Sequence, residues 1–340
     1  MFRGNPALTG AAASTLADQP KVRWRWTTPE PILSSAAIVR DTVFVGTDDE
    51  HLYAFDLMSG KVRWKYKARS MVQSSPTVHG GVVYFGDELG VFHAVDAATG
   101  KKRWTFQTGA QIVSSANIAG DRVLFGSYDA FLYCLSATDG ELIWKYETAG
   151  RIHGTPGVAG DTALVAGCDG EVHIVRLSDG TQRAAVDMGS VAGSAAAVIG
   201  DRSVIGTYGN TVIGVDIKAA KLAWTYENPD RQFPFFGSAA LTEDTAFVGG
   251  RDKTLYALDL ATGKPRWQFR TGGKIDSSPV LVGDRVCFGS YDNHVYLLNA
   301  RTGKESWKFN TGEPISASPA IGRGCLVIGT EDGTLYCFGE

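Results

Sequence analysis

Residues 96–104 read Asp-Ala-Ala-Thr-Gly-Lys-Lys-Arg-Trp, and the pattern returns at residues 259–267 as Asp-Leu-Ala-Thr-Gly-Lys-Pro-Arg-Trp. Outward from these two stretches, the tryptophan recurs about every 40 residues along the chain. It stands at Trp24, Trp64, Trp104, Trp144, Trp224, Trp267 and Trp307, with Ala184 where one further copy is due. A fixed period of this length is typical of a repeat architecture.

Two more markers share this period. Every copy contains a pair of small residues: Ser34-Ser35, Ser74-Ser75, Ser114-Ser115, Gly154-Thr155, Ser194-Ala195, Gly237-Ser238, Ser277-Ser278 and Ala317-Ser318. A glycine ends an apolar run in each copy except the fourth, which has Ala166. Each copy also contains four short β-branched and aromatic runs, which are residues 277–282, 285–289, 294–300 and 305–311 in the seventh copy. Such runs, separated by Gly, Asn and Asp turns, predict an all-β fold.

These repeats predict an eight-bladed β-propeller with four-stranded antiparallel blades. The inner runs are apolar on both faces, so each sheet needs cover on both sides, and a closed ring of sheets supplies it. The last copy stops after its third strand at Glu340, whereas residues 22–27 align with the fourth strand of the first copy. We therefore expect residues 22–27 to complete the last blade. Residues 22–340 then form a single propeller domain, and residues 1–21 form an arm that is either mobile or laid across one face.

The composition excludes several classes of protein. The formal charge is -3, with 33 basic and 36 acidic residues, and no basic stripe indicates a nucleic-acid partner. No apolar run is long enough to span a membrane, and the chain as given starts without the apolar core of a signal peptide. Five widely spaced cysteines predict free thiols rather than a disulfide framework. We expect a monomer.

The Asp-x-x-Thr-Gly-Lys-x-x-Trp stretch resembles the tryptophan-docking motif of the PQQ-type (pyrroloquinoline-quinone-like) repeat β-propellers, and the resemblance covers residues 22–340. It implies that each tryptophan packs on a neighbouring blade. It also implies a periplasmic or cell-surface location, although the chain as given shows no export signal. Members include the quinoprotein dehydrogenases, which bind PQQ and calcium, the non-catalytic propeller of the outer-membrane β-barrel assembly machinery, and sensor domains. The fold alone therefore does not select a function.

Catalytic signatures are missing from the sequence. No two cysteines are adjacent, unlike the vicinal pair beside the cofactor in many quinoprotein dehydrogenases, and the repeats carry a single three-residue insertion instead of long covering loops. Neither a phosphate loop nor the zinc and serine-hydrolase motifs occur. We predict no catalytic, cofactor-binding or metal-binding residues, and PQQ with calcium remains the weaker alternative.

The predicted binding surface lies at the mouth of the central channel. It combines polar residues of the connections that lead into the inner strands, tyrosines in the second hairpin turns, and the inserted loop at residues 228–236. The candidate residues are Gln73, Arg151, His153, Asp276, Tyr128, Tyr208, Tyr291, Arg231, Phe233, Phe235 and Phe236. A solvated rim is the alternative for the polar residues, and packing inside the ring is the alternative for the phenylalanines.

The leading functional hypothesis is a non-enzymatic scaffold that engages a protein or peptide partner through one face of the propeller. This hypothesis rests on the inserted aromatic loop at residues 228–236, which has no set of catalytic residues beside it. The alternatives are an enzyme with its site in the channel, either a quinoprotein dehydrogenase or a cofactor-free lyase or cyclase using Gln73, His153 and Asp276, and a sensor of a small ligand or sugar.

Overall fold

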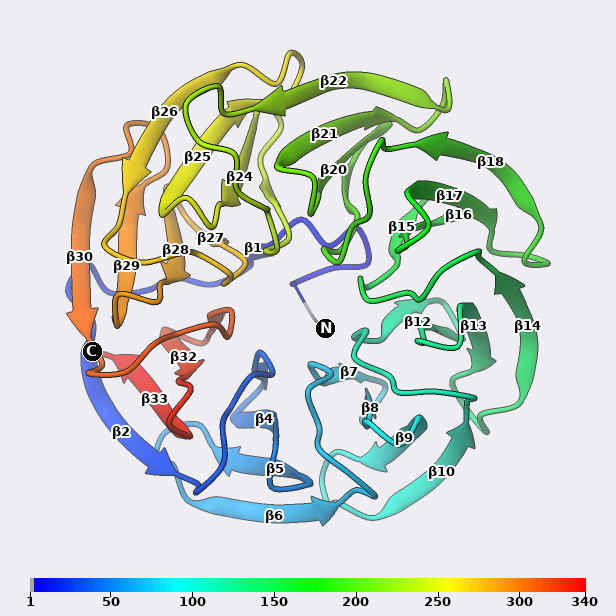
Figure 1. Cartoon of the computed structure of the whole chain (residues 1–340). Coiled ribbons are helices and arrows are strands. Elements are labelled where there is room, and N and C mark those ends of the chain that lie inside the picture. Colours follow the sequence, from blue (N-terminus) through cyan, green and yellow to red (C-terminus); the bar gives the residue numbers. More distant parts are fainter. Residues whose placement is uncertain (1–2) are drawn as a thin grey trace.

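The computed structural model describes residues 3–340, which fold into eight β-sheets arranged radially around a common axis (Figure 1). Within these residues there is no helix, and each sheet has four antiparallel strands, with one sheet gaining a short fifth strand. The predicted eight-bladed propeller is confirmed. All five cysteines in this part of the chain are free thiols.

The first four blades follow one another along the chain. Their strands are β3 (Ala37–Val39), β4 (Thr42–Thr47), β5 (His51–Asp56) and β6 (Val62–Lys67); β7 (Thr77–His79), β8 (Val82–Gly86), β9 (Val91–Asp96) and β10 (Lys102–Gln107); β11 (Asn117–Ala119), β12 (Arg122–Gly126), β13 (Phe131–Ser136) and β14 (Leu142–Glu147); and β15 (Gly157–Ala159), β16 (Thr162–Ala166), β17 (Glu171–Arg176) and β18 (Gln182–Asp187).

The remaining blades repeat this order. Their strands are β19 (Ala197–Ile199), β20 (Arg202–Gly206), β21 (Thr211–Asp216) and β22 (Lys221–Glu227); β23 (Ala240–Leu241), β24 (Thr245–Gly249), β25 (Thr254–Asp259) and β26 (Pro265–Arg270); β27 (Val280–Val282), β28 (Arg285–Gly289), β29 (His294–Asn299) and β30 (Glu305–Asn310); and β31 (Ala320–Gly322), β32 (Cys325–Gly329) and β33 (Thr334–Gly339). The inner strands are shorter than predicted, because the small pair and the residue after it lie ahead of the ladder.

The chain closes the ring with its own beginning. Strand β2 (Lys21–Thr27) pairs antiparallel with β33 and supplies the outer strand of the last blade. Figure 1 shows β2 beside β33 next to the C-terminus. The predicted closure by residues 22–27 is therefore confirmed, with the strand beginning one residue earlier.

A belt of hydrogen bonds joins the inner ends of the blades. The backbone amide of the second small residue donates to the hydroxyl of its counterpart in the next blade, as Ser35 does to Ser75 at 3.0 Å. The same bond occurs at Ser75–Ser115, Ser115–Thr155, Ala195–Ser238, Ser238–Ser278, Ser278–Ser318 and Ser318–Ser35. Thr155 cannot form it, because Ala195 has no hydroxyl. The small pairs thus serve blade-to-blade bonding.

Each tryptophan contacts the following blade. The indole of Trp64 donates to the carbonyl of Ala97 at 3.1 Å, and its ring lies so close to Gly100 that a Cβ there would clash at 2.7 Å. Trp24, Trp104, Trp144, Trp224 and Trp267 repeat both contacts with the corresponding carbonyl and turn glycine of the next blade. The turn glycine also has a positive φ, 70° at Gly100. Glycine suits this position for two reasons, because it adopts a positive φ without strain and leaves room for the indole ring.

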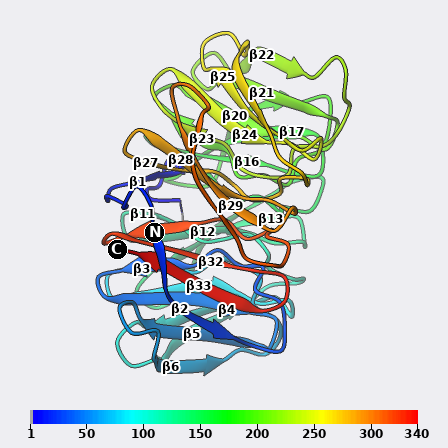
Figure 2. The ribbon, with the colours of Figure 1, turned by 90° about the vertical axis from the view of Figure 1, so that its left-hand side faces the viewer.

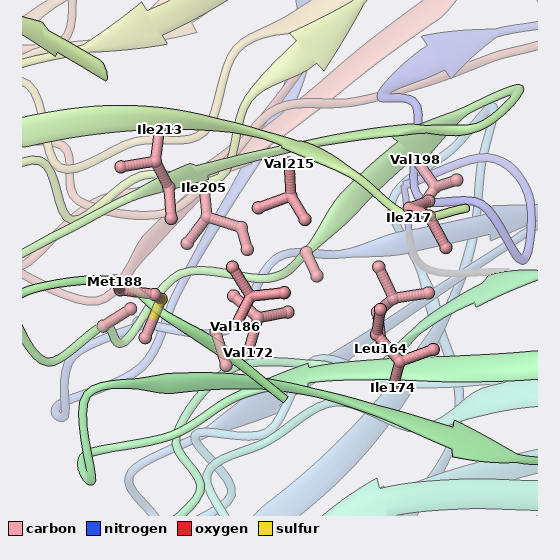
Figure 3. Packing of buried hydrophobic residues seen from close by; sticks show 13 residues of the cluster. Leu164, Val172, Ile174, Val186, Met188, Val198, Ile205, Ile213, Val215 and Ile217 are labelled. Carbon is pink, nitrogen blue, oxygen red and sulfur yellow. The ribbon is translucent and has the colours of Figure 1, made fainter. Parts of the chain in front are cut away.

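The interface between blades 4 and 5 is built differently. Ala184 replaces the tryptophan on one side, and Ala220 replaces the receiving glycine on the other. In the same interface, Ala166 replaces the repeat glycine and Ala192 takes the place of the larger apolar residue that this glycine faces elsewhere. Figure 3 shows aliphatic side chains filling this interface. The substitutions in these two blades therefore occur in pairs, with each change in blade 4 facing a complementary change in blade 5.

The arm, residues 3–20, lies across one face and does not extend into solvent. Four consecutive inner strands donate backbone amides to carbonyls of the arm at 2.7–2.9 Å: Val158 to Pro6, Val198 to Ala7, Leu241 to Thr9 and Leu281 to Gly10. Strand β1 (Ala11–Ala12) then pairs parallel with β27, and Figure 2 shows β1 at one face of the ring. Leu8 is fully buried against the inner strands. Of the two expectations for the arm, the structure shows the laid-across arrangement.

Candidate functional site

The face opposite the arm carries a repeated hydrogen bond that positions the candidate residues. In every blade, the carbonyl just before the first residue of the second hairpin turn accepts the backbone amide of the connection that enters the next blade, at 2.9–3.3 Å, as Thr47 does from Val72. These turn residues are Asp48, Glu88, Tyr128, Cys168, Tyr208, Arg251, Tyr291 and Glu331. Together with the residues 25 positions later, 28 across the insertion, and with Leu33 as the counterpart of Glu331 across the closure, they form what we call the rim. The bond holds each turn residue beside its rim partner.

One rim pair joins Tyr128 and His153. The phenol oxygen lies 2.6 Å from Nδ1 of His153, and the guanidinium of Arg151 lies 5.2 Å from the Tyr128 ring. Burial lowers the pKa of His153, and the nearby charge of Arg151 lowers it further. Burial also raises the pKa of Tyr128. At neutral pH this pair is therefore a neutral imidazole hydrogen bonded to a neutral phenol, with a cation above it.

A second cluster surrounds Arg251. Its Nε and Nη2 each lie 2.8 Å from a different carboxylate oxygen of Asp276, which makes a two-point ion pair. The same guanidinium lies 3.5 Å from the centre of the Phe236 ring, and Phe236 packs on Tyr208 with ring centres 4.5 Å apart. The ion pair with Asp276 and the packing against Phe236 together hold the charged guanidinium in one position and one plane.

Lys274 extends this cluster toward the next blade. Its ammonium lies 3.2 Å from Asp276 and 3.8 Å from the centre of the Tyr291 ring. Asp276 is therefore shared between two cations, and both cations lie against aromatic faces. The arrangement presents flat, partly exposed rings and cations that already have fixed positions.

The opposite side of the rim is acidic. Asp48 accepts a hydrogen bond from Gln73 at 3.2 Å through Oδ2, whereas its buried Oδ1 has no hydrogen-bond partner within residues 3–340. Burial raises the pKa of Asp48 to about 6, and the charge of Glu88 adds to this rise. The rim thus has an acidic arc in blades 1 and 2, and an arc of cations and aromatic rings further around the ring.

The inserted loop at residues 228–236 is held firmly. Asn228 bonds the hydroxyl of Tyr256 at 2.5 Å and the carboxylate of Asp252 at 3.1 Å. Arg231 donates to the carbonyl of Asp252 at 3.4 Å, so its guanidinium anchors the loop. Gln232 adds a bond to Glu227 at 3.1 Å. The loop is therefore preorganised by side-chain bonds to its own blade and the next.

The three phenylalanines of this loop have three different environments. Phe235 is 1 % exposed and packs between blades 5 and 6, where its amide donates to the carbonyl of Thr207. Its place in the predicted binding surface is corrected, because it occupies the repeat position held by Ile275 in the following copy. Phe236 packs against Arg251 and Tyr208 at the rim, and Phe233 is 49 % exposed.

The residues predicted for a cofactor-free enzyme are not assembled into one site. Gln73 pairs with Asp48, His153 with Tyr128, and Asp276 with Arg251 and Lys274. Each of the three belongs to a different blade and interacts with its own rim neighbour. The period also assigns Cys168 and Glu331 to the rim, although the sequence analysis did not select them; counting 40 residues from Tyr128 and Tyr291 finds both.

Two buried chains of polar groups resemble catalytic relays. Asp87, His93 and Tyr66 are linked by contacts of 2.9 and 3.1 Å. A second chain joins Asp169, His173 and Tyr146. In blades 1, 3, 6 and 7 a tyrosine at the histidine position bonds a turn aspartate directly, as Tyr133 bonds Asp129 at 2.7 Å. The histidines therefore maintain a structural contact of the repeat.

A calcium-bound quinone would need a set of oxygen ligands around one point of the rim. Calcium takes six to eight oxygen ligands, commonly including several carboxylates. Within residues 3–340, no group of three or more His, Cys, Asp or Glu side chains is placed to hold a metal ion. Asp276, the carboxylate nearest the aromatic arc, is already shared by two cations.

Comparison with solved structures supports the fold. BamB from Moraxella catarrhalis superposes with a TM-score of 0.78 at 19 % identity, covering 94 % of this chain and 100 % of that chain. A europium-containing methanol dehydrogenase gives 0.81 at 13 % identity, over 100 % of this chain and 97 % of that one. Quinohemoprotein alcohol dehydrogenase from Comamonas testosteroni gives 0.84 at 13 % identity, over 99 % and 80 %. At these identities the likeness shows the fold alone.

Family membership has a separate basis. Comparison with curated proteins gave no match. No helix within residues 3–340 is long and apolar enough to cross a membrane. The family model described as outer membrane protein assembly factor BamB matches residues 13–151, 94–233 and 228–339. These overlapping matches span nearly the whole ring, and the chain therefore belongs to the PQQ-like propeller family that this model describes.

Proposed function

We propose that this protein is a non-enzymatic binding scaffold that engages a protein or peptide partner through the rim face. The observation that carries the proposal is Phe233, which is 49 % exposed within a loop that side-chain bonds hold in place. A large aromatic side chain exposed on a preorganised loop is typical of an interface anchor.

The rim beside the loop has the composition of a protein-binding surface. Aromatic residues and arginine are enriched at interfaces, and here Arg251, Phe236 and Tyr208 form one packed group. The acidic arc at Asp48 and Glu88 lies on the same face. Complementary charge on a partner would fix its orientation on the rim.

The family description supports a role of this kind. The matching model is named for an assembly factor, and scaffolding of an assembly requires binding surfaces without reaction chemistry. The rim residues pair with one another in separate blades and are not arranged as an acid, a base and a nucleophile around one point. A binding role therefore accounts for the geometry better than a catalytic one.

The proposal is tested by placing a photo-crosslinking amino acid at position 233 and irradiating cells of the native host. The matched control carries it at position 142, where Leu142 is 46 % exposed on an outer strand. We expect one discrete adduct from position 233 and none from position 142. The adduct partner, once purified, should bind the parent protein and lose most of its affinity for Phe233→Ser. Equal crosslinking from both positions, or full binding by Phe233→Ser, would contradict the proposal.

A spectroscopic experiment tests the competing catalytic role. Protein mixed with PQQ and calcium should give the sum of the separate absorption spectra, because the rim offers no ligand cluster for the metal. A shifted quinone band that Asp276→Asn abolishes would instead favour a quinoprotein.

A further inference from the structure

A cavity of about 300 Å³ opens on the face that carries the arm, distant from the rim. The arm follows the inner strands of blades 4 to 7 and leaves this space beside blades 8 and 1. Its walls are Arg3, Gly4 and residues 10–13 of the arm, residues 35–38 and Arg40 of blade 1, Val280 of blade 7, and residues 318–323 of blade 8. The described residues that line it include three arginines and no acidic side chain.

Arg3 brings an incompletely bonded cation to this cavity. Its side chain is almost wholly buried at 7 % exposure. Nε donates to the carbonyl of Leu8 at 3.3 Å, and Nη2 donates to those of Ala239 at 2.5 Å and Pro279 at 3.3 Å. Nη1 is also buried and has no hydrogen-bond partner within residues 3–340. Leaving such a donor unpaired is costly, so the charge of Arg3 is only partly compensated by the chain itself.

The guanidinium also remains a cation. Burial lowers the pKa of Arg3 to about 9, which still leaves the group protonated at neutral pH. No carboxylate is among its partners, since all three bonds go to backbone carbonyls. A buried cation without a counter-ion is the condition under which an anion is bound most strongly.

Arg40 and Arg323 supply a second, independent observation. They occupy the same place in the first hairpin turn of blades 1 and 8, and both have a φ of 52°. The corresponding turns of five of the six other blades have glycine there, at Gly80, Gly120, Gly160, Gly200 and Gly283, with φ between 56° and 64°. A residue with a side chain is strained in this conformation. Arginine therefore replaces glycine at the two turns that border the cavity, despite the strain.

Among the described residues, only one of the two turn arginines forms an ion pair. Arg323 contacts Asp41 at 3.0 Å, and both side chains are largely exposed. Asp41 thus balances part of one cation at the edge of the cavity. Arg40 has no such contact among the described residues. The buried guanidinium of Arg3 has no acidic partner among them either.

We propose that this cavity binds a small oxyanion, a carboxylate or a phosphate, between Arg3, Arg40 and Arg323. Guanidinium groups bind these planar or tetrahedral oxyanions through paired N–H donors. Arg3 gives the cavity wall a cation held in place by its bonds to backbone carbonyls, and Arg40 and Arg323 add two more guanidinium groups to the lining.

The test is isothermal titration of the full-length protein with inorganic phosphate and, separately, with succinate, at constant ionic strength held by sodium chloride. We expect saturable binding of one equivalent of at least one probe. The double variant Arg40→Gly/Arg323→Gly should lose about tenfold or more in affinity, since each guanidinium contributes charge-assisted bonds. It should melt close to the parent, because glycine is the residue that the equivalent turns already carry. Arg3→Lys, which keeps the charge and loses the paired donors, should also weaken binding.

The control is Arg202→Gln, which removes one exposed arginine near the first turn of blade 5, on the same face but outside the cavity. Its affinity should equal that of the parent. The proposal is overturned if neither probe shows saturable binding, or if Arg202→Gln weakens binding as much as the double variant does. Phosphate and succinate, compared with each other, identify which oxyanion the cavity prefers.

Discussion

Trp24 and Cys337 are register partners across the junction where the ring closes, with Trp24 on β2 and Cys337 on β33. The indole of Trp24 also donates to Leu57 of the next blade at 2.8 Å, so one residue ties the closing strand to two blades. The junction therefore uses the same tryptophan contact as the uninterrupted blades.

Two truncations separate the roles of β2 and the arm. Deleting residues 1–27 leaves β33 as an unpaired edge with an apolar face, and we expect aggregation on size-exclusion chromatography. Deleting residues 1–20 keeps β2 and removes the buried Leu8, Leu16 and Arg3. This shorter truncation should stay folded and monomeric with a lower melting temperature. If both truncated proteins elute and melt like the parent, neither segment has the structural role described.

The missing tryptophan of blade 4 can be restored only together with its receptor. Ala184→Trp alone should destabilise by about 1–3 kcal/mol, because the ring would meet the Cβ of Ala220. Ala220→Gly alone should be neutral or stabilising by about 1 kcal/mol, because it relieves a φ of 50°. The double variant should be more stable than the sum of the two changes predicts. A double-mutant cycle by urea unfolding measures the coupling, expected at about 0.5–3 kcal/mol. A coupling near zero would contradict the paired-loss interpretation.

Asp48 gives the protein a pH dependence of definite sign. Burial raises the pKa of this carboxyl to about 6, so between pH 4 and pH 6 the folded state binds more protons than the unfolded state. This residue therefore makes the free energy of unfolding fall as pH rises through that window. Asp48→Asn should be more stable than the parent at pH 7 by on the order of 1 kcal/mol, after allowance for solvent screening at the rim.

The advantage of Asp48→Asn should vanish below pH 4, where the native carboxyl is neutral in both states. Chemical denaturation of both proteins at several pH values checks this. Asp230→Asn, at an exposed loop aspartate, is the control and should run parallel to the parent. A constant difference between Asp48→Asn and the parent at all pH values would show that its charge is not responsible.

Phe235 and Phe233 should respond oppositely to substitution. Phe235→Ala removes a fully buried ring between blades 5 and 6 and should cost about 3–5 kcal/mol in stability. Phe233→Ala removes an exposed ring and should change the melting temperature little. Thermal unfolding followed by circular dichroism compares the two. A marked loss of stability in Phe233→Ala would mean that this side chain packs in the fold and would weaken its assignment as a partner contact.

The sequence predicted the fold well because each blade repeats the same physical requirements. The tryptophan, the small pair and the repeat glycine all make contacts between blades, so they recur wherever blades meet. The rim positions followed from the same period. Phe235 was misplaced because the insertion obscures its register; counting backward from Gly237 places it in the core.

Other features could not be derived from the repeat. The arm is a single segment without copies, so no periodicity indicates that Leu8 is buried or that Pro6 accepts a bond from Val158. Ala184 and Ala220 were visible as separate departures, but their contact depends on how one blade packs on the next. Pairings such as Arg251 with Asp276 require side-chain directions that the pattern alone does not supply.

The closing strand has a consequence for biosynthesis. Apart from the short β1 of the arm, residues 21–27 leave the ribosome before any other strand of the ring, yet their partner β33 is the last of these strands to be made. While the chain is being translated, both edges of the unfinished ring stay open, and the earliest strand has to wait for the final one. The ring therefore cannot close until β33 has been made, and this long-range contact slows folding and leaves exposed strands for chaperones to protect.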